Sequence, residues 1–127
     1  TAITFTTEDF DVHGYHDTGS NTSRVTPLIA GTYRVNGSVS LTGAADHTIV
    51  EAFIRKNGST GLPPAFRLAA AFTNQTLVYG TTAFVVCDGV ADYFEVCLRV
   101  TKTAGTVATV ISSQFASVLE WTLERPA

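Results

Sequence analysis

Gly31-Thr32-Tyr33-Arg34-Val35-Asn36-Gly37-Ser38-Val39-Ser40-Leu41 alternates between apolar and polar residues with a period of two. From Tyr33 onward the odd-numbered positions are apolar except for Gly37, and the even-numbered positions are polar. Because successive side chains of a strand point to opposite faces, this pattern predicts a β-strand over Tyr33–Leu41 with one buried face. Gly37 interrupts the apolar side, which indicates a bulge or a close approach of the backbone to another element.

The same period continues along most of the chain, and no stretch has the spacing of an amphipathic helix. Asn57-Gly58 is a tight-turn dipeptide, and Gly61 with Pro63-Pro64 indicates an irregular connection. Further strands are predicted over Thr48–Lys56, Ala65–Phe72, Leu77–Cys87, Asp92–Thr101, Thr106–Ile111 and Phe115–Leu123. Short strands with turns at this spacing are typical of an all-β, two-sheet antiparallel sandwich or barrel.

Length and composition limit the alternatives. The chain of 127 residues fits a single domain spanning residues 1–127. Its net charge of −3 provides no extended positive field, which argues against nucleic acid as a partner. It has no long uncharged apolar run and no basic stretch followed by an apolar leader, so we expect neither membrane insertion nor secretory processing. Thr1 is compatible with removal of an initiator methionine, and we expect a complete small gene product.

Several predicted strands have apolar residues on both faces. Phe84 and Val86 alternate with Ala83, Val85 and Cys87 along one strand. The last strand repeats this arrangement, with Phe115, Leu119, Trp121 and Leu123 on one face and Ala116 and Val118 on the other. A soluble monomer avoids exposing such second faces. The pattern therefore predicts oligomerisation without fixing its symmetry.

Five stretches, taken together and in order, resemble a known superfamily. They are Phe10–Asp17 with Asn21–Thr26, Arg55–Gly58, Asp92–Val96 and Ser113–Leu119. This order is similar to that of the complement globular-head and tumour-necrosis-factor-like jelly-roll superfamily, in the form found in bacteriophage structural proteins. One departure is that the family usually has glycine directly before aspartate at the corner, whereas Val90-Ala91 separates Gly89 from Asp92 here. The corner is therefore expected to be longer.

The resemblance implies a jelly roll of about eight to ten strands that assembles as a compact homotrimer around apolar inner-sheet strands. It leaves residues 1–8 as a possible N-terminal arm or first strand. The candidates for the trimer interface are Tyr33, Val85, Cys87, Phe115, Leu119 and Trp121.

No combination of residues indicates catalysis. The chain has three histidines, His13, His16 and His47, and no Gly-x-Ser-x-Gly elbow, phosphate-binding loop or dinucleotide fingerprint accompanies them. We therefore expect a protein that is not an enzyme and that has no cofactor. Cys87 and Cys97 are close enough in sequence to suggest a disulfide, but the turn between them favours two packed thiols.

An acidic cluster near the start of the chain is the best candidate for a metal site. It contains Asp9, Asp11, His13, His16 and Asp17, and carboxylates with imidazoles can hold calcium or a transition ion. The spacing matches no known ligand motif, and acidic turns commonly cap backbone amides. We therefore expect a structural turn and no metal, with Asp11, His13, His16 and Asp17 as the weak metal candidates.

Two classes of function follow. The first is a trimeric capsid decoration protein on the exterior of a bacteriophage head, bound to the major capsid protein or another virion protein. Thr1–Thr7 would then be an arm that adds as a strand to a capsid edge, with Thr1, Ile3 and Phe5 as partner contacts. The alternative is a receptor-binding head at the tail tip that recognises a host surface glycan or protein. Tyr15, Tyr79, Tyr93 and Trp121 are candidate aromatic platforms for either kind of partner.

Overall fold

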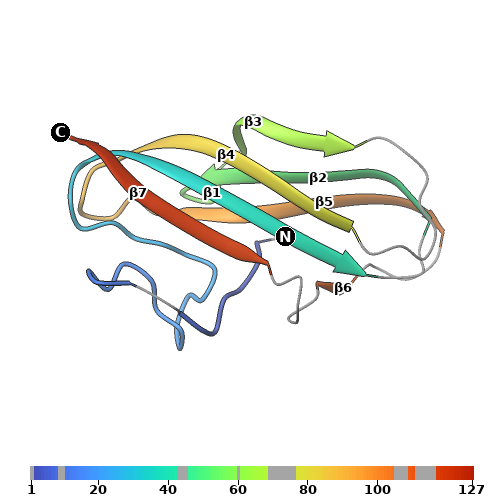
Figure 1. Cartoon of the computed structure of the whole chain (residues 1–127), viewed down its shortest axis with the longest axis horizontal. Coiled ribbons are helices and arrows are strands. Elements are labelled where there is room, and N and C mark those ends of the chain that lie inside the picture. Colours follow the sequence, from blue (N-terminus) through green and yellow to red (C-terminus); the bar gives the residue numbers. More distant parts are fainter. Residues whose placement is uncertain are drawn as a thin grey trace.

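Alternating apolar and polar residues form seven strands in the computed structural model, which describes residues 2–8, 11–42, 46–59, 61–68, 77–104, 109–110 and 117–127 (Figure 1). The strands are β1 (Gly31–Thr42), β2 (Asp46–Lys56), β3 (Gly61–Leu68), β4 (Leu77–Cys87), β5 (Phe94–Ala104), β6 (Thr109–Val110) and β7 (Val118–Pro126). Within these residues no helix is long and apolar enough to cross a membrane. The prediction of an all-β chain is confirmed for the part that the structure describes.

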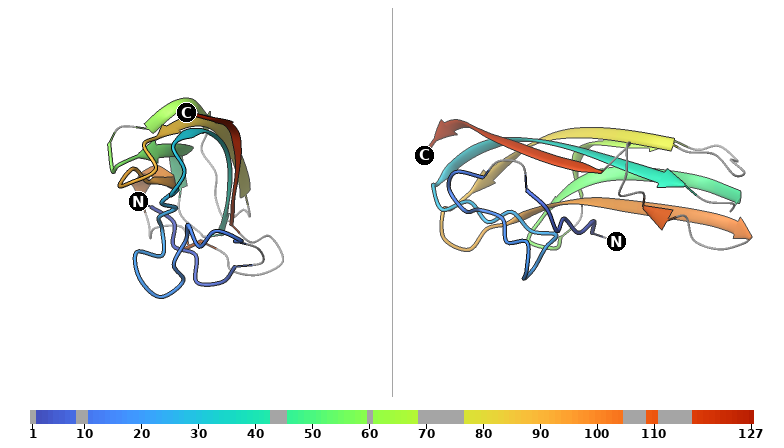
Figure 2. Two further views of the ribbon diagram at one scale, coloured as in Figure 1. Left: turned by 90° about the vertical axis from the view of Figure 1, so that its left-hand side faces the viewer. Right: turned by 60° about the horizontal axis from the view of Figure 1, so that its bottom comes forward.

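The strands form two antiparallel sheets that pack face to face (Figure 2). In one sheet, β1 pairs with β4 on one edge, and its other edge is shared by β7 and β6. In the other sheet, β2 lies between β3 and β5. The predicted two-sheet sandwich is therefore confirmed.

The N-terminal residues cover the edge of β5 that faces away from β2. Val25 forms an antiparallel bridge with Phe94, and their backbone N–H and C=O groups exchange two hydrogen bonds of 3.0 Å. Further along the same edge, Ile3 N donates to Val96 O over 3.0 Å, next to the bridge between Ala2 and Cys97. The first residues of the chain thus extend the sheet of their own molecule.

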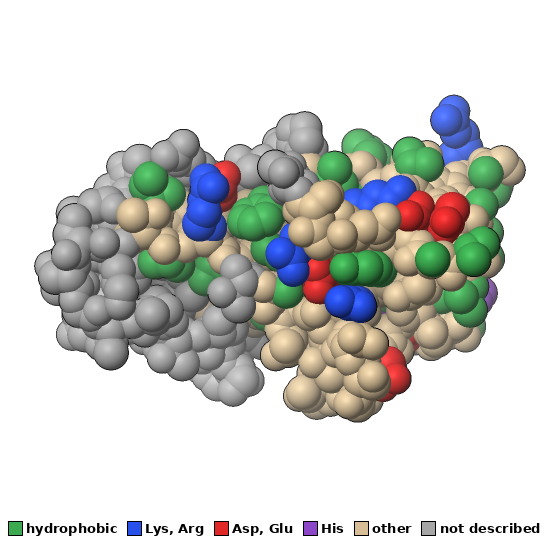
Figure 3. All heavy atoms as spheres, turned by 180° about the vertical axis from the view of Figure 1, so that it is seen from behind, with side chains coloured by type: hydrophobic (Ala, Val, Ile, Leu, Met, Phe, Trp, Pro, Cys, Tyr) green, Lys and Arg blue, Asp and Glu red, His purple; other side chains and the backbone are tan. Residues whose placement is uncertain are grey.

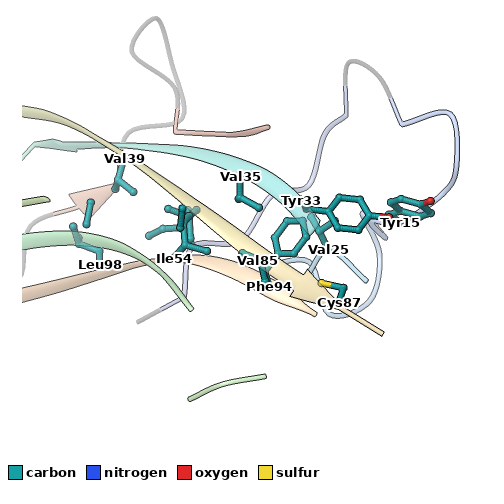
Figure 4. Packing of buried hydrophobic residues seen from close by; sticks show 14 of the residues in the cluster. Tyr15, Val25, Tyr33, Val35, Val39, Ile54, Val85, Cys87, Phe94 and Leu98 are labelled. Carbon is teal, nitrogen blue, oxygen red and sulfur yellow. The ribbon is translucent and has the colours of Figure 1, made fainter. Parts of the chain in front are cut away.

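Every second residue of the central strands points into the space between the sheets (Figure 4). This core contains Tyr33, Val35 and Val39 of β1, Val50, Ala52 and Ile54 of β2, Ala83, Val85 and Cys87 of β4, and Phe94, Val96 and Leu98 of β5. These are the faces that the period of two predicts as apolar, so the predicted alternation is confirmed for these strands.

The strand bounds agree with the sequence predictions to different degrees. β4 has the predicted bounds, and β1, β2 and β5 differ by a few residues at their ends. β7 continues to Pro126, beyond the predicted end at Leu123, because its last residues still pair with the start of β1. Of the predicted strand Thr106–Ile111, the structure describes only Thr109–Val110.

The predicted irregular connection at Pro63-Pro64 is wrong, because both prolines lie within β3. β3 lies at the edge of its sheet, and edge strands accept proline because one of their sides has no ladder partner. The pairing register between β2 and β3 also shifts between Ala52 and Ile54, opposite the prolines. A bulge at a sheet edge is a place where a strand accepts proline.

Charged pairs cover the outer face of the sheet that contains β2 and β5 (Figure 3). The Glu95 carboxylate is buried and accepts hydrogen bonds from Arg55 Nε and Ser23 Oγ, both over 2.7 Å. Arg24 lies over the Tyr93 ring with its guanidinium carbon 4.3 Å from the ring centroid. A buried carboxylate needs such partners, and these bonds hold the 23–24 segment on the sheet.

Gly37 marks a close approach between the sheets. A Cβ atom added there would lie 2.6 Å from Val96 Cγ2 and 3.2 Å from Ile54 Cδ1. The register of β1 with β4 and β7 is continuous at Gly37, so of the two predicted explanations the close approach is confirmed and a bulge is not. The missing side chain lets β1 lie against β2 and β5.

We expect Gly37→Ala to destabilise the fold by about 1–3 kcal/mol, because the new methyl group must displace Val96 or the backbone. The measurement is the free energy of unfolding from urea denaturation. Gly80→Ala is the matched control, because a Cβ there would meet only Gly37 O, at 4.0 Å. The control is expected to be neutral or slightly stabilising. Equal losses in the two variants would contradict the close approach.

Candidate functional site

A groove of about 600 Å³ lies between β7 and the N-terminal residues. One wall is the stretch from Ser117 to Leu123, and the opposite wall includes Phe5 and Val12. Tyr15 and Tyr33, which are almost fully buried, lie at its base. Its volume and its mixture of apolar and polar lining are typical of binding sites.

The β7 wall is anchored in the core. Leu119, Trp121 and Leu123 are half-buried and pack against the core cluster. The Trp121 ring meets the Phe94 ring edge to face, with the centroids 6.4 Å apart. The groove is also lined by exposed apolar side chains, including Val12 at 69% and Val118 at 42% exposure.

His16 fixes the opposite wall. Its buried ring is paired through Nδ1 with Glu8 Oε1 at 2.7 Å and through Nε2 with the main-chain oxygen of Thr22 at 3.0 Å. Phe5 N donates to the same oxygen of Thr22 over 2.7 Å. The ring thus connects the 2–8 segment to the turn at residues 20–23.

Aromatic contacts continue from this wall into the core. The His13 ring is stacked on Tyr15 with the centroids 5.2 Å apart, and Tyr15 meets Tyr33 edge to face at 6.3 Å. Tyr33 Oη donates to Ile29 O over 2.8 Å. Burial is the main cause that raises the pKa of the Tyr33 hydroxyl well above its usual value. Tyr33 is therefore a neutral packing residue at the base of the groove.

The carboxylates of the acidic cluster cap backbone amides. Asp11 Oδ2 accepts from His16 N over 2.8 Å, and Asp17 Oδ1 accepts from Gly19 N over 2.7 Å and from Ser20 N over 3.1 Å. In the part of the chain that the structure describes, no three metal-ligating side chains come together, and Asp9 lies outside that part. The arrangement of Asp11 and Asp17 is that of the expected structural turn.

The structure divides the candidates for the trimer interface into two groups. Tyr33, Val85 and Cys87 are at most 2% exposed and belong to the core of the single chain, so their side chains are not available to a second copy. Leu119 and Trp121 line the groove. Phe115 lies outside the described residues. The period of two identifies a buried face but does not distinguish burial within a chain from burial between chains.

The candidate partner contacts also have partners within the chain. Ile3 is 5% exposed, and Phe5 packs against the core from the groove side. Thr1 lies outside the described residues. The arm expected to reach a capsid edge is instead bonded to β5 of its own molecule at Ile3, because the outer edge of β5 offers unpaired backbone groups there.

The two cysteines are buried free thiols, so the prediction of packed thiols is confirmed. Cys87 faces the core, and Cys97 points to the opposite face of β5 from Val96. Burial raises the pKa of each thiol to about 11. Both therefore stay protonated at neutral pH and are not activated as nucleophiles.

A polar network joins two turns at one end of the sandwich. Asn57 and Gly58 have φ values of 52° and 67°, as a tight hairpin turn requires. Asn57 Nδ2 donates to Asp92 Oδ1 over 2.7 Å, and Asn57 Oδ1 accepts from Tyr93 N over 2.9 Å. The turn after β2 is thereby bonded to the corner between β4 and β5.

The corner itself is organised by Asp88. Its Oδ1 accepts from the amides of Val90, Ala91 and Asp92 over 2.9 to 3.0 Å. Gly89 has a φ of 74° and lies so close to Ala30 that a Cβ would be 2.5 Å from Ala30 N. Val90 and Ala91, which separate Gly89 from Asp92, are thus held in the turn by hydrogen bonds from their amides to the Asp88 carboxylate.

No protein-family model matches the chain, and no curated protein is significantly similar to it. Sequence reasoning named Tyr15 and Trp121 as aromatic platforms but did not bring them together. The groove joins residues from both ends of the chain, and no local motif signals that contact.

We expect Asp92→Asn to lower the urea midpoint at pH 7. Lys56 Nζ lies 2.6 Å from Asp92 Oδ2, and this contact and the Asn57 bond lower the pKa of the Asp92 carboxyl below its usual 3.8. A lowered folded-state pKa stabilises the fold above the unfolded-state value, and this stability is lost as the pH falls through the folded-state value. The difference between wild type and variant should therefore shrink in acid.

Glu124→Gln is the control for this measurement, because it removes an exposed ion pair with Arg34. Exposed ion pairs contribute only about 0–1 kcal/mol to stability. A difference between wild type and Asp92→Asn that stays constant from pH 7 to pH 2 would show that the charge of Asp92 does not stabilise the corner.

Proposed function

We propose that the chain is a non-enzymatic structural protein of a bacteriophage particle: a homotrimeric decoration protein with a jelly-roll fold, bound to the exterior of the head. Two features of the fold support this role, together with the resemblance in the sequence. One is the nested order of strand pairing. The other is an apolar patch formed by Phe84 and Val86 on the outer face of β4. The patch is the main support for a homotrimer, because it offers an apolar surface to a second copy of the chain.

Nested pairing supports the jelly roll. β2 pairs with β3, and β1 pairs with β4, the strands that directly flank this hairpin. One step further out, Val25 pairs with Phe94 at the start of β5. Folding a long hairpin over itself gives two sheets whose strands pair in this nested order, which is the arrangement of a jelly roll.

Phe84 and Val86 support self-association. Both are 64% exposed on the outer face of β4, while their neighbours Ala83 and Val85 are buried. Arg34 and Thr32 of β1 lie opposite them in the register, so the patch is at the β4 side of the sheet. Two large apolar side chains exposed next to each other are typical of an interaction surface.

The histidine and cysteine environments support a non-enzymatic role. In a catalytic triad the histidine presents Nε2 to a nucleophile, whereas Nε2 of His16 meets the Thr22 carbonyl oxygen. The thiols of Cys87 and Cys97 are buried and protonated at neutral pH. Neither arrangement activates a nucleophile.

The alternative is a receptor-binding head at the tail tip, and the groove beside β7 is the observation that favours it. Immunogold labelling of intact particles separates the two roles. Copies spread over the head shell would support decoration, and copies confined to the tail tip would support host attachment.

We expect Phe84→Ser to convert a trimer, three times the 13.5 kDa chain, into a monomer in sedimentation experiments. Removing a large exposed apolar side chain weakens an interface with little effect on the isolated fold. Val90→Ser is the matched control, because Val90 is 77% exposed but lies at the corner, away from the sheet face. A wild-type chain that sediments as a monomer at all concentrations would refute the trimer.

A further inference from the structure

β7 has one open edge. It pairs with β1 through the other edge, from Gly31 opposite Pro126 to Ser38 opposite Val118. Within the described residues no other strand pairs with β7. An edge strand presents a row of unpaired N–H and C=O groups that can bond to an additional strand.

The groove runs along this edge. Leu119, Trp121 and Leu123 point toward the core, Val118 and Glu120 have the opposite parity, and all five line the groove. Because both parities contribute, the groove follows the strand edge and not one sheet face. The lining stretch from Ser117 to Leu123 corresponds to roughly 20 Å of extended chain.

The charges of the groove have one sign. Glu8, Asp11 and Glu120 line it, and no lysine or arginine is among its described lining residues. Of the two lining histidines, His16 is already paired with Glu8. A basic partner therefore fits the groove better than an acidic one.

We propose that an extended, basic segment of another protein adds to the open edge of β7 as an extra strand. Its backbone bonds to β7, its alternate apolar side chains enter beside Trp121, and its lysine or arginine side chains face Glu120. Strand addition of this kind takes affinity from the main chain and specificity from alternate side chains.

Two other occupants fit less well. A second copy adding through its own β7 would bring Glu120 and Glu124 of one chain against the same acidic residues of the other. Tyr15, which is 6% exposed, and Tyr33, which is 1% exposed, offer no ring face to a glycan in the groove.

The first test is an unbiased selection of random twelve-residue peptides on the intact chain. The expected result is enrichment of peptides in which lysine or arginine alternates with apolar residues. Enrichment of acidic or proline-rich peptides, or no enrichment, would overturn the proposal.

The second test measures the affinity of the most enriched peptide. Trp121 is the single tryptophan of the chain and lines the groove, so its emission reports occupancy. We expect Glu120→Lys to weaken binding at least tenfold and Glu124→Lys, which lies outside the groove, to weaken it less than threefold. Methylation of alternate peptide amides should abolish binding, since it removes the donors to β7. Equal effects of the two substitutions, or undiminished binding of the methylated peptide, would refute strand addition.

This inference extends the proposed function and does not depend on the trimer. β4, which carries Phe84 and Val86, and β7 pair with opposite edges of β1. Phe84→Ser is therefore expected to leave the peptide affinity unchanged within a factor of two. Loss of peptide binding in that variant would place the peptide on the β4 patch and would overturn the assignment to β7.

Discussion

The apolar layer between the two sheets determines the positions of all other parts of the molecule. Tyr33, Val35, Ile54 and Phe94 are each at most 1% exposed in this layer. Their burial forces the even-numbered residues of β1 and the alternate residues of β4 outward. The surface features lie outside this layer. They are the exposed patch, the charged pairs around Glu95 and the groove. At Gly37 the absence of a side chain leaves room for Val96 and Ile54 of the opposite sheet.

The alternation of apolar and polar residues predicted most of the strands. It failed where the structure of a segment depends on its position in the sheet. β4 had its predicted bounds because its alternation is regular and turn residues flank it. The prolines of β3 were misassigned because proline is accepted only at an edge or a bulge, and neither is visible in the sequence. Tyr33 and Val85, which were predicted as candidates for the trimer interface, lie in the core of the single chain, because a period of two does not say which surface covers an apolar face.

The candidate site was less predictable than the fold. Trp121 was visible as an aromatic residue in an apolar strand, and the acidic turn around Asp11 was visible as a turn. Their meeting across one groove depends on the route of the N-terminal residues, which bond to Val96 and leave β7 open. Hydrophobic periodicity carries no information about which sheet edge the N-terminal residues bond to.

The bond between Ile3 and Val96 has a consequence for biosynthesis. Ile3 cannot make this bond until Val96, which lies near the start of β5, has been synthesised. Contacts over such a sequence separation make folding slow compared with helical proteins of the same size. Until then the backbone groups that later bond to β5 stay unpaired, which exposes the chain to misassembly with other chains during this interval.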